Sequence, residues 1–428
     1  MDALTFLRER TRTSTGRVLF CSMCIMPPVG GLIGHLAGHN PWSFMDIDAV
    51  LCAATAEASG ASPYSRLHCS GLAPAAYVYA PQVAAWLEPL VTAMGGLGAR
   101  WAYVSCLFLP ALAVMVWYAL GRTLKGGDWR ARMLAVSGLV PMAFCGGNLG
   151  LVMHALVISS LLVNRWRHWL FIPIVMLCVV VKPTFILYLL VPLFEARPWR
   201  ERLAVVAGSG AMGLVVVITT AIAAGPLFSS WVHALSSVAL RDQPGLGWFA
   251  FTTWLGLTPN APFTLLLTFT FVAAMAASGI AIAEAADLKD DERRLLAIGI
   301  LPLLTPRLMD YDLLALVPFV ALLLRVAPSI GGRIFRYNVS WLLVGTLGFG
   351  VIINVLHILH KWPRSQVDIA AYCIVVLACG AKLAAKRWGQ TQGRLYRNDR
   401  KMIGPSSPLH IRKVPGIGVS QGRPAEEM

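Results

Sequence analysis

The sequence from Leu295 to Arg325 reads LLAIGILPLLTPRLMDYDLLALVPFVALLLR, and its pattern decides the fold class. An apolar segment, 295–304, is followed by a polar stretch, 305–312, and by a second apolar segment, 313–324. Continuous apolar segments of this length are typical of helices that are buried on all sides, in a bundle or in a lipid bilayer. We interpret the stretch as two helices that cross a membrane in opposite directions, with the polar turn at one membrane face.

The composition of the whole chain agrees with a membrane protein. Of its 428 residues, 57% are hydrophobic and 13% are charged, whereas soluble domains average about 45–50% apolar and about 25% charged residues. A soluble core could not bury this much apolar sequence, because much of any soluble domain is surface. We therefore expect an all-α, polytopic bundle of about twelve transmembrane helices, each with roughly 20 apolar residues, or fewer where the bundle shields the helix.

The basic residues predict the orientation of this bundle. The formal net charge is +15, and Lys and Arg concentrate in the short connections on one side of the predicted membrane. This is the positive-inside pattern of membrane proteins rather than a nucleic-acid-binding surface, so no nucleic acid partner is expected. Both chain ends are predicted to be cytoplasmic. The connections on the other side carry few basic residues, namely Arg66, Arg241, Lys361 and Arg364.

The same pattern predicts the boundaries of the parts. Residues 1–17 form a basic cytoplasmic N-terminus, and residues 18–388 form the transmembrane domain, which begins with a retained signal anchor. Its long outer loops cover residues 38–97 and 225–261. Residues 389–428 are polar, basic and interrupted by Gly and Pro, which predicts a disordered cytoplasmic tail. The Ala, Gly and Arg bias favours a bacterial source, and hence a bacterial cytoplasmic membrane.

The nine cysteines predict no metal site. Cys21 and Cys24 lie in the first apolar helix without a second pair that would complete a zinc site, so we expect them to pack in the core. Cys52 and Cys69 share the first outer loop and could form a disulfide.

Polar residues at or near the membrane gather on the predicted outer side. A turn in or near the bilayer must line a protein or water-filled cavity, because lipid cannot satisfy its backbone groups. Ionisable residues at such a depth are costly and are therefore functional candidates. The polar residues concerned are Asp46, Asp48, Asn148, Lys182, Arg307, Asp310, Tyr311 and Asp312.

These residue types suit acid-base and phosphate chemistry. Lys182 and Arg307 could hold a phosphate, the first as a point charge and the second through its planar guanidinium group. Asp46 or Asp48 could take a proton from a hydroxyl nucleophile. A structural interpretation stays open, in which the aspartates are solvated loop residues, Lys182 extends to the lipid headgroups and Arg307 braces a turn. The occurrence of all of them on one side favours a functional site.

A series of short motifs also runs through residues 17–330. In chain order the motifs are Asp46-Ile47-Asp48-Ala49-Val50, Ala53-Ala54, Gly60, Pro63-Tyr64, Tyr79-Ala80-Pro81, Gly147-Asn148, Val181-Lys182-Pro183-Thr184, Thr305-Pro306-Arg307 and Asp310-Tyr311-Asp312. In order and spacing the series resembles glycosyltransferase family 87, which comprises type C, polyprenol-phosphate-mannose-dependent α-mannosyltransferases and many relatives.

The resemblance implies a type C membrane enzyme, a hexosyltransferase. It implies transfer of a sugar, with mannose expected, from a polyprenyl-phosphate donor to a lipid or glycan acceptor, with inversion, at the periplasmic or exterior face. No cofactor beyond the lipid-phosphate sugar is implied. The alternative is a transporter or flippase for a lipid-linked saccharide, whose cavity would need the same cations. The absence of visible inverted repeats favours the enzyme.

The resemblance also implies roles for single residues. Asp46 is the expected general base, with Asp48 as the second choice, and Lys182 and Arg307 are expected to contact the donor phosphate. Further donor contacts are expected from Tyr64, Tyr79 and Asn148, with support from Asp310, Tyr311 and Asp312.

Overall fold

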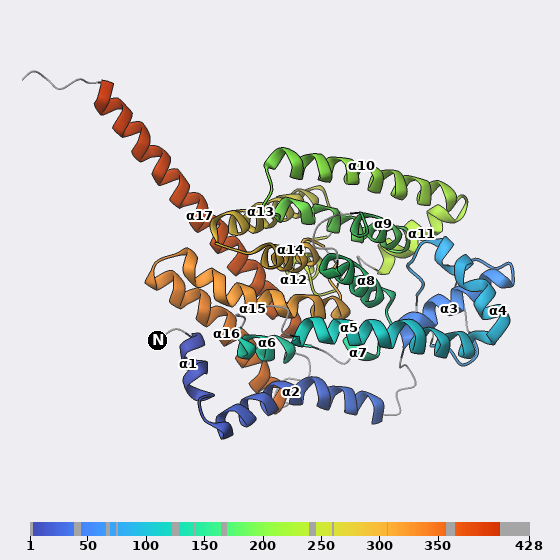
Figure 1. The fold of residues 1–428 in the computed structure, drawn as a ribbon. Coiled ribbons are helices and arrows are strands. Elements are labelled where there is room, and N and C mark those ends of the chain that lie inside the picture. Colours follow the sequence, from blue (N-terminus) through green and yellow to red (C-terminus); the bar gives the residue numbers. More distant parts are fainter. Residues whose placement is uncertain are drawn as a thin grey trace, which may run out of the picture. The chain divides into compact units, whose positions relative to one another are not determined.

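The computed structural model describes residues 3–37, 44–65, 69–73, 76–121, 128–139, 142–163, 169–238, 245–258, 261–305, 307–356 and 364–402. Every regular element in these ranges is a helix (Figure 1). The α-helices are α1 (Ala3–Arg10), α2 (Ser14–Ala37), α3 (Met45–Ala58), α4 (Pro81–Tyr103), α5 (Leu109–Leu120), α6 (Trp129–Val136), α7 (Met142–Cys145), α8 (Leu149–Val163), α9 (Phe171–Val181), α10 (Trp199–Ala223), α11 (Leu227–Ser237), α12 (Trp248–Trp254), α13 (Pro262–Ala285), α14 (Asp290–Leu304), α15 (Leu313–Ile330), α16 (Arg333–Leu356) and α17 (Arg364–Met402). Three further helices are the π-helix η1 (Val104–Phe108) and the 3-10 helices η2 (Pro183–Phe194) and η4 (Asp310–Asp312).

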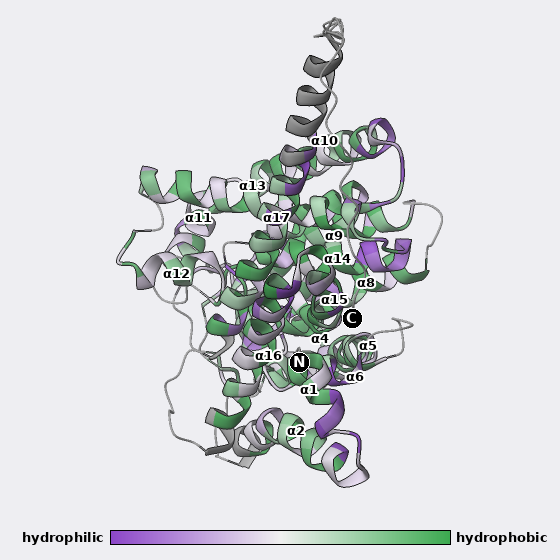
Figure 2. Cartoon of the chain, turned by 90° about the vertical axis from the view of Figure 1, so that its left-hand side faces the viewer, coloured by the Kyte–Doolittle hydropathy of each residue, from purple (hydrophilic) through white to green (hydrophobic). Residues whose placement is uncertain are grey.

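Six helical segments are long and apolar enough to cross a membrane, as judged by length and composition. The chain is therefore a helical membrane protein, as predicted. Figure 2 shows hydrophobic residues over most of these helices. The helices α8, α9 and η2 are apolar but shorter than a full span. The six segments are Ser14–Ile33, Pro81–Leu120, Trp199–Ala223, Pro262–Ala285, Asp310–Ile330 and Gln366–Trp388.

The chain divides into two compact units, residues 1–383 and 384–428, and the division falls within α17. In the second unit, residues 384–402 are helical. The prediction of a disordered tail is therefore wrong for residues 389–402. This stretch lacks proline and contains two Gln, three Arg and one Leu, which are good helix formers. Residues 403–428 lie outside the described residues.

The helix α15 is the central helix of the first unit. It packs against α5, α6, α14 and α16, and nearly all of its residues are buried. A helix that is apolar on all sides is expected in this position. The pair α14 and α15, joined through η4, confirms the two helices and polar turn predicted from residues 295–324.

The first predicted outer loop, residues 38–97, is largely helical where the structure describes it. It contains α3 and most of α4, and the part of α4 after Gly95 continues through η1 into α5. Pro81 begins the helix at a position where its missing N–H costs nothing. Gly95, with a φ of 69° and a ψ of 165°, is not helical and joins two helices within α4 across a kink.

A disulfide joins Cys52 of α3 to Cys69, with the two Cα atoms 5.7 Å apart. The predicted pairing is thereby confirmed. The bond therefore attaches the segment that follows α3 to the middle of that helix. Cys21 and Cys24 take no part in a disulfide, and Cys24 is buried, in agreement with a packing role.

Candidate active site

The predicted site residues lie at one end of the helices in the first unit, and ion pairs between Arg and Glu lie at the other end. Lys182 directly precedes η2, whereas Glu195 directly follows it. In the same way, η4 holds Asp310, Tyr311 and Asp312 and directly precedes α15, whereas Arg325 lies near the far end of α15. The helices thus separate two polar regions.

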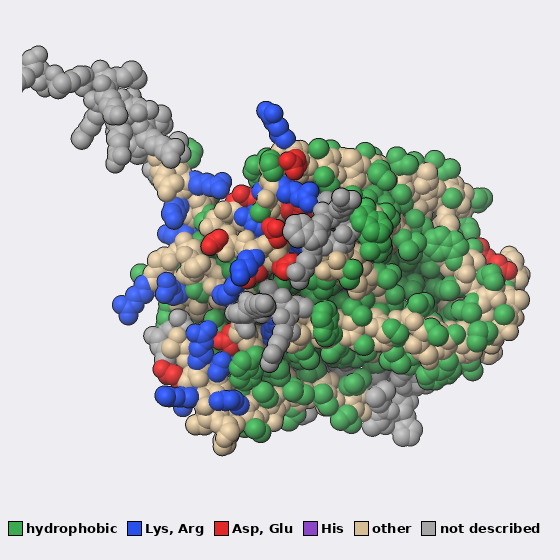
Figure 3. Space-filling model, viewed as in Figure 1, with side chains coloured by type: hydrophobic (Ala, Val, Ile, Leu, Met, Phe, Trp, Pro, Cys, Tyr) green, Lys and Arg blue, Asp and Glu red, His purple; other side chains and the backbone are tan. Residues whose placement is uncertain are grey.

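The ion pairs connect the ends of several helices. Figure 3 shows Lys and Arg side chains, with Asp and Glu among them, gathered on one part of the face in view, while the part near α4 and α5 is mainly hydrophobic. The closest pairs are Arg202–Glu284 at 2.6 Å and Arg325–Glu292 at 2.7 Å. The basic residues Arg66, Arg122, Lys125, Arg165, Arg167, Arg241 and Lys361 lie outside the described ranges.

The beginning of α3 fixes the position of Asp46. The backbone N–H of Phe44 donates to the carbonyl of Cys145 (2.7 Å), and that of Asp46 donates to the carbonyl of Gly146 (3.1 Å). The first N–H groups of a helix have no partner inside the helix, so these bonds satisfy them and attach α3 to the turn between α7 and α8. Gly147 in this turn has a φ of 68°, and a Cβ there would lie 3.2 Å from the Cα of Phe44. Both facts favour glycine.

Asp46 is partly exposed and lies among cationic and amide groups. The Nδ2 of Asn148 donates to Oδ2 of Asp46 at 2.9 Å, and the Oδ1 of Asn148 accepts from the N–H of Gly150 at 2.6 Å. Burial raises the pKa of Asp46, an effect opposed by the bond from Asn148 and by the charges of Lys182 and Arg307. A carboxylate with a raised pKa is a better proton acceptor than a solvated one.

Asp48 has the surroundings of a structural residue. It is fully buried, and its Oδ2 accepts from the N–H of Ala73 at 3.0 Å and from the guanidinium of Arg100 at 3.2 Å. These bonds connect α3 to α4 and to the segment between them. The structure therefore does not bring Asp48 to Lys182 and Arg307, and its position does not support the role of second-choice base.

A break between two helices positions Lys182. Its backbone is extended, with a φ of −143°, because the residue before a proline avoids the helical conformation. The Nζ of Lys182 donates to the hydroxyl of Tyr311 at 2.8 Å and lies 4.7 Å from the centroid of that ring. The ring of Phe185 lies 5.9 Å away. A hydroxyl and two aromatic faces thus hold the ammonium group.

The second outer loop packs against the segment that carries Arg307. The N–H of Leu246 donates to the carbonyl of Leu308 at 2.7 Å. Gly245 has a φ of 79°, and a Cβ there would lie 2.3 Å from the oxygen of Leu308. Only glycine allows this approach. Arg307 is partly exposed, and its charge acts on Asp46.

Of the two tyrosines predicted to contact the donor, Tyr79 reaches the site and Tyr64 lies behind it. Tyr79 is buried, and its hydroxyl lies 3.5 Å from Oδ1 of Asn148, which is a long and weak hydrogen bond. The hydroxyl of Tyr64 donates to the carbonyl of Tyr79 at 2.7 Å. Tyr64 therefore braces the backbone that carries Tyr79.

The helix η4 holds the remaining predicted residues. The Oδ2 of Asp312 accepts from the N–H of Met309 at 2.8 Å and closes the turn. Its Oδ1 lies 2.6 Å from Nε2 of His154, and Nδ1 of His154 lies 2.8 Å from the hydroxyl of Tyr188. Asp310 is partly exposed on the same turn, and its charge interacts with that of Asp312.

Sequence reasoning missed His154, Tyr188 and Arg100. An ionisable residue within an apolar helix is a signal for function, and His154 interrupts the apolar α8 in this way. Nothing in the sequence, however, pairs it with Asp312, which is 158 residues away.

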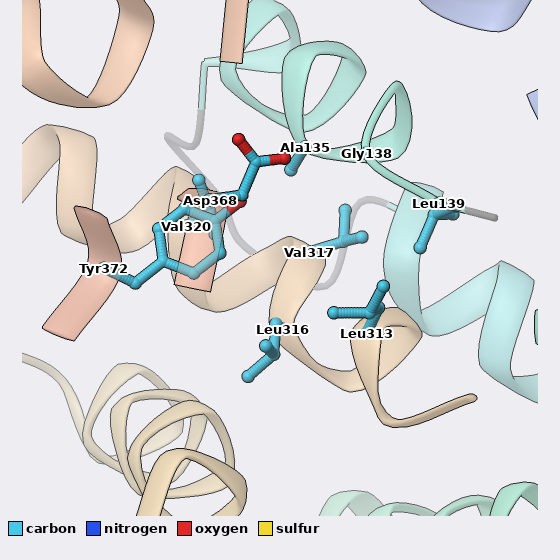
Figure 4. A pocket seen from close by; sticks show the side chains of 9 residues that line it. All are labelled: Ala135, Gly138, Leu139, Leu313, Leu316, Val317, Val320, Asp368 and Tyr372. Carbon is cyan, nitrogen blue, oxygen red and sulfur yellow. The ribbon is translucent and has the colours of Figure 1, made fainter. Parts of the chain in front are cut away.

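Two small cavities lie beside η4. One has a volume of about 20 Å³ and is lined in part by His154, Lys182 and Asp312. The other has a volume of about 10 Å³ and is mainly apolar, apart from Asp368, whose carboxylate points toward Gly138 (Figure 4). Each has room for about one water molecule, so neither can hold a sugar or a phosphate group. Among the described residues, no group of three or more His, Cys, Asp or Glu side chains could hold a metal ion.

Gly150 allows α8 to pack closely against Tyr311 and Asn148. Its replacement by alanine is therefore expected to destabilise the protein. A Cβ there would lie 2.5 Å from Cε2 of Tyr311 and 2.7 Å from Oδ1 of Asn148. Overpacking of this kind costs about 1–3 kcal/mol, so the thermal unfolding midpoint in detergent should fall for Gly150→Ala. Gly208→Ala is the control, since a Cβ at that position meets nothing within 4 Å. Equal midpoints for the two variants would contradict the packing of Tyr311 on α8.

Comparison with protein-family models, curated proteins and solved structures finds no match for this chain. The fold defines the class as a helical membrane protein, and the resemblance of the sequence motifs to a glycosyltransferase family stays a prediction.

Proposed function

We propose that the protein is a membrane glycosyltransferase that transfers a sugar, with mannose expected, from a polyprenyl-phosphate donor to a lipid or glycan acceptor. The observation that carries this proposal is that Asp46 lies within reach of the charges of Lys182 and Arg307, at one end of the bundle. All three side chains are partly exposed, and the charges of both cations act on the carboxyl group.

This arrangement suits a single displacement at the anomeric carbon. A hydroxyl oxygen of the acceptor forms a bond to that carbon while the bond from the carbon to the phosphate oxygen breaks. Asp46 accepts the hydroxyl proton. Lys182 and Arg307 stabilise the negative charge that grows on the leaving polyprenyl phosphate. Attack from the side opposite the phosphate inverts the configuration at the anomeric carbon.

The proposal includes a type C architecture in a bacterial cytoplasmic membrane. The six long spans would be completed by short helices such as α8, α9 and η2, to give about twelve crossings in all. The site would face the periplasm or exterior. The basic residues at the opposite end of the helices support this orientation, because basic connections stay in the cytoplasm.

The disulfide between Cys52 and Cys69 supports the same orientation, because disulfides persist mainly outside the reducing cytosol. In intact cells, a membrane-impermeant reductant should open this bond, as measured by a thiol-specific mass tag added after quenching. A Cys52→Ser, Cys69→Ser double variant is the control and should show no reductant-dependent tagging at these positions. A bond that only a permeant reductant opens would place this end of the bundle in the cytoplasm.

The test of function uses the purified full-length protein in lipid. It should transfer the sugar from a polyprenyl-phosphate mannose to an extract of membrane lipids, with release of polyprenyl phosphate. Failure with mannose, glucose and other common hexose donors would refute the enzyme. If the protein instead moves the intact lipid-linked saccharide across vesicles, the transporter alternative is correct.

A further inference from the structure

Three buried polar side chains near Lys182 form a hydrogen-bonded chain. The hydroxyl of Tyr188 lies 2.8 Å from Nδ1 of His154, and Nε2 of His154 lies 2.6 Å from Oδ1 of Asp312. Tyr188, His154 and Asp312 are 4%, 4% and 4% exposed. Buried polar groups need hydrogen-bond partners, because each unsatisfied group costs several kcal/mol. The three side chains therefore fix one another.

The chemistry of the three groups assigns the protons. An ionised Asp312 only accepts, so Nε2 of His154 carries the proton and donates it. Nδ1 is then the lone-pair nitrogen and accepts from the hydroxyl of Tyr188. In this arrangement both ring nitrogens have a hydrogen-bond partner. His154 thus holds the first oxygen of Asp312, and the N–H of Met309 holds the second at 2.8 Å.

Asp312 in turn connects this buried chain to the cations. By accepting from Met309 it fixes the turn that presents Tyr311, and the hydroxyl of Tyr311 accepts from Lys182 at 2.8 Å. The charge of Asp312 also acts on Lys182. A displaced Asp312 would therefore change both the orientation of Tyr311 and the position of the ammonium group.

His154 does not itself touch a substrate. The cavity beside it has a volume of about 20 Å³, which is room for about one water molecule. Its ring also packs against Phe185 and Tyr188, with centroids 4.9 and 5.7 Å away. The hydrogen-bonded route from His154 to Lys182 runs through Asp312 and the turn that carries Tyr311.

We propose that His154 is a positioning residue for phosphate binding, which acts through Asp312 to hold Lys182 and Tyr311 in place. This inference rests on the proposed function, since it takes the ligand of Lys182 and Arg307 to be the phosphate of a polyprenyl-phosphate sugar. It adds a residue from α8 that neither contacts the donor nor belongs to the motifs of the family resemblance.

Two substitutions of His154 separate the two hydrogen bonds. A Gln side chain places its amide N–H₂ near the position of Nε2 and can still donate to Asp312. The shorter Asn side chain reaches the position of Nδ1 and can accept from Tyr188, but it leaves Asp312 without its donor. The two variants differ by one methylene group, so a difference between them reports the bond to Asp312.

The experiment measures binding of polyprenyl phosphate, the released product, to the full-length protein in lipid nanodiscs, together with transfer kinetics. His154→Asn should weaken binding roughly tenfold or more, since hydrogen bonds to charged groups are the strong ones. It should raise the KM for the donor and leave the KM for the acceptor unchanged. His154→Gln should recover most of the affinity. Ser160→Ala on the same helix, where the hydroxyl bonds only to the backbone of Val157, should match the wild type.

The outcomes distinguish the two levels of the proposal. If wild-type protein neither binds polyprenyl phosphate nor transfers sugar, the proposed function fails. If wild-type protein does both, and His154→Asn and His154→Gln bind polyprenyl phosphate equally well, the positioning role is wrong. Should His154→Asn fail to fold, Tyr188→Phe keeps the test open, because it removes only the bond to Nδ1. Because the hydroxyl of Tyr188 orients the ring of His154, Tyr188→Phe should raise the donor KM, and an unchanged donor KM in this variant would then overturn the proposal.

Discussion

Replacement of Asp46 by Asn is expected to reduce sugar transfer by about 10²–10⁴-fold, the range typical of a lost general base. The amide keeps the size of the side chain and can still bond to Asn148, but it cannot take a proton from the acceptor hydroxyl. The fold should be preserved, because the backbone bonds that attach α3 to the turn before α8 do not involve the carboxylate. Initial rates at saturating donor and acceptor, with the unfolding midpoint of each variant, measure both effects.

Asp48→Asn is the matched control, since it makes the same chemical change two residues away. The carboxylate of Asp48 pairs with Arg100 in a buried site, and removal of one member of a buried ion pair costs about 3–5 kcal/mol. We therefore expect a large loss of stability, with a specific activity of the folded fraction close to that of the wild type. The reverse result, with a stable but inactive Asp48→Asn, would identify Asp48 as the base instead.

The pH dependence of the wild type offers a second check on Asp46. Burial raises the pKa of this carboxyl group, and the base is active only when it is ionised. Activity should therefore be lost as the pH falls through a value above the ordinary range for Asp, about 3.9 in model peptides. A kcat/KM that stays level down to that ordinary value would contradict the environment described for Asp46.

Replacement of Lys182 by Met is expected to reduce kcat by about 10²–10³-fold, as removal of a charge-stabilising group from a site typically does. Met keeps the length and the apolar stem of Lys, so it can still pack on the rings of Tyr311 and Phe185. What it loses is the charge that stabilises the leaving phosphate. The affinity for polyprenyl phosphate should fall with kcat.

Tyr311→Phe is the control for Lys182. It removes the hydroxyl that accepts from Nζ but keeps the ring that lies under the ammonium group. We expect a loss of about tenfold or less, in keeping with one neutral hydrogen bond. Lys182→Met with an undiminished rate would remove the main support for phosphate as the ligand of this site.

Several features of the fold could be predicted from the sequence because they depend on local physics. The apolar segments of α14 and α15 have no alternative to burial, so their helical and membrane character follows from composition and length. Lys182 lies at a break because Pro183 excludes the helical conformation from the residue before it. Gly147 marks a turn for a similar reason, namely a backbone that only glycine adopts easily.

Other features are local but ambiguous in sequence. Gly95 joins two helices across a kink, and the sequence pattern could not show that both belong to the apolar stretch from Pro81 to Leu120. Likewise, the polar composition of residues 389–402 favoured irregular structure, yet the stretch is helical. In the second case helix propensity and polarity favoured different structures, and the sequence pattern alone could not decide between them.

The sequence by itself determined that this is a helical membrane protein and that its polar turns share one end of the helices. Only the tertiary structure decided which aspartate meets the cations. Asp46 and Asp48 lie two residues apart on one helix, so their side chains point about 200° around the axis from each other. One can face Lys182 and Arg307 only if the other faces Arg100, and the choice depends on how α3 packs. The pairing of His154 with Asp312 was likewise invisible, because it is a contact between distant segments that forms when α8 packs beside η4.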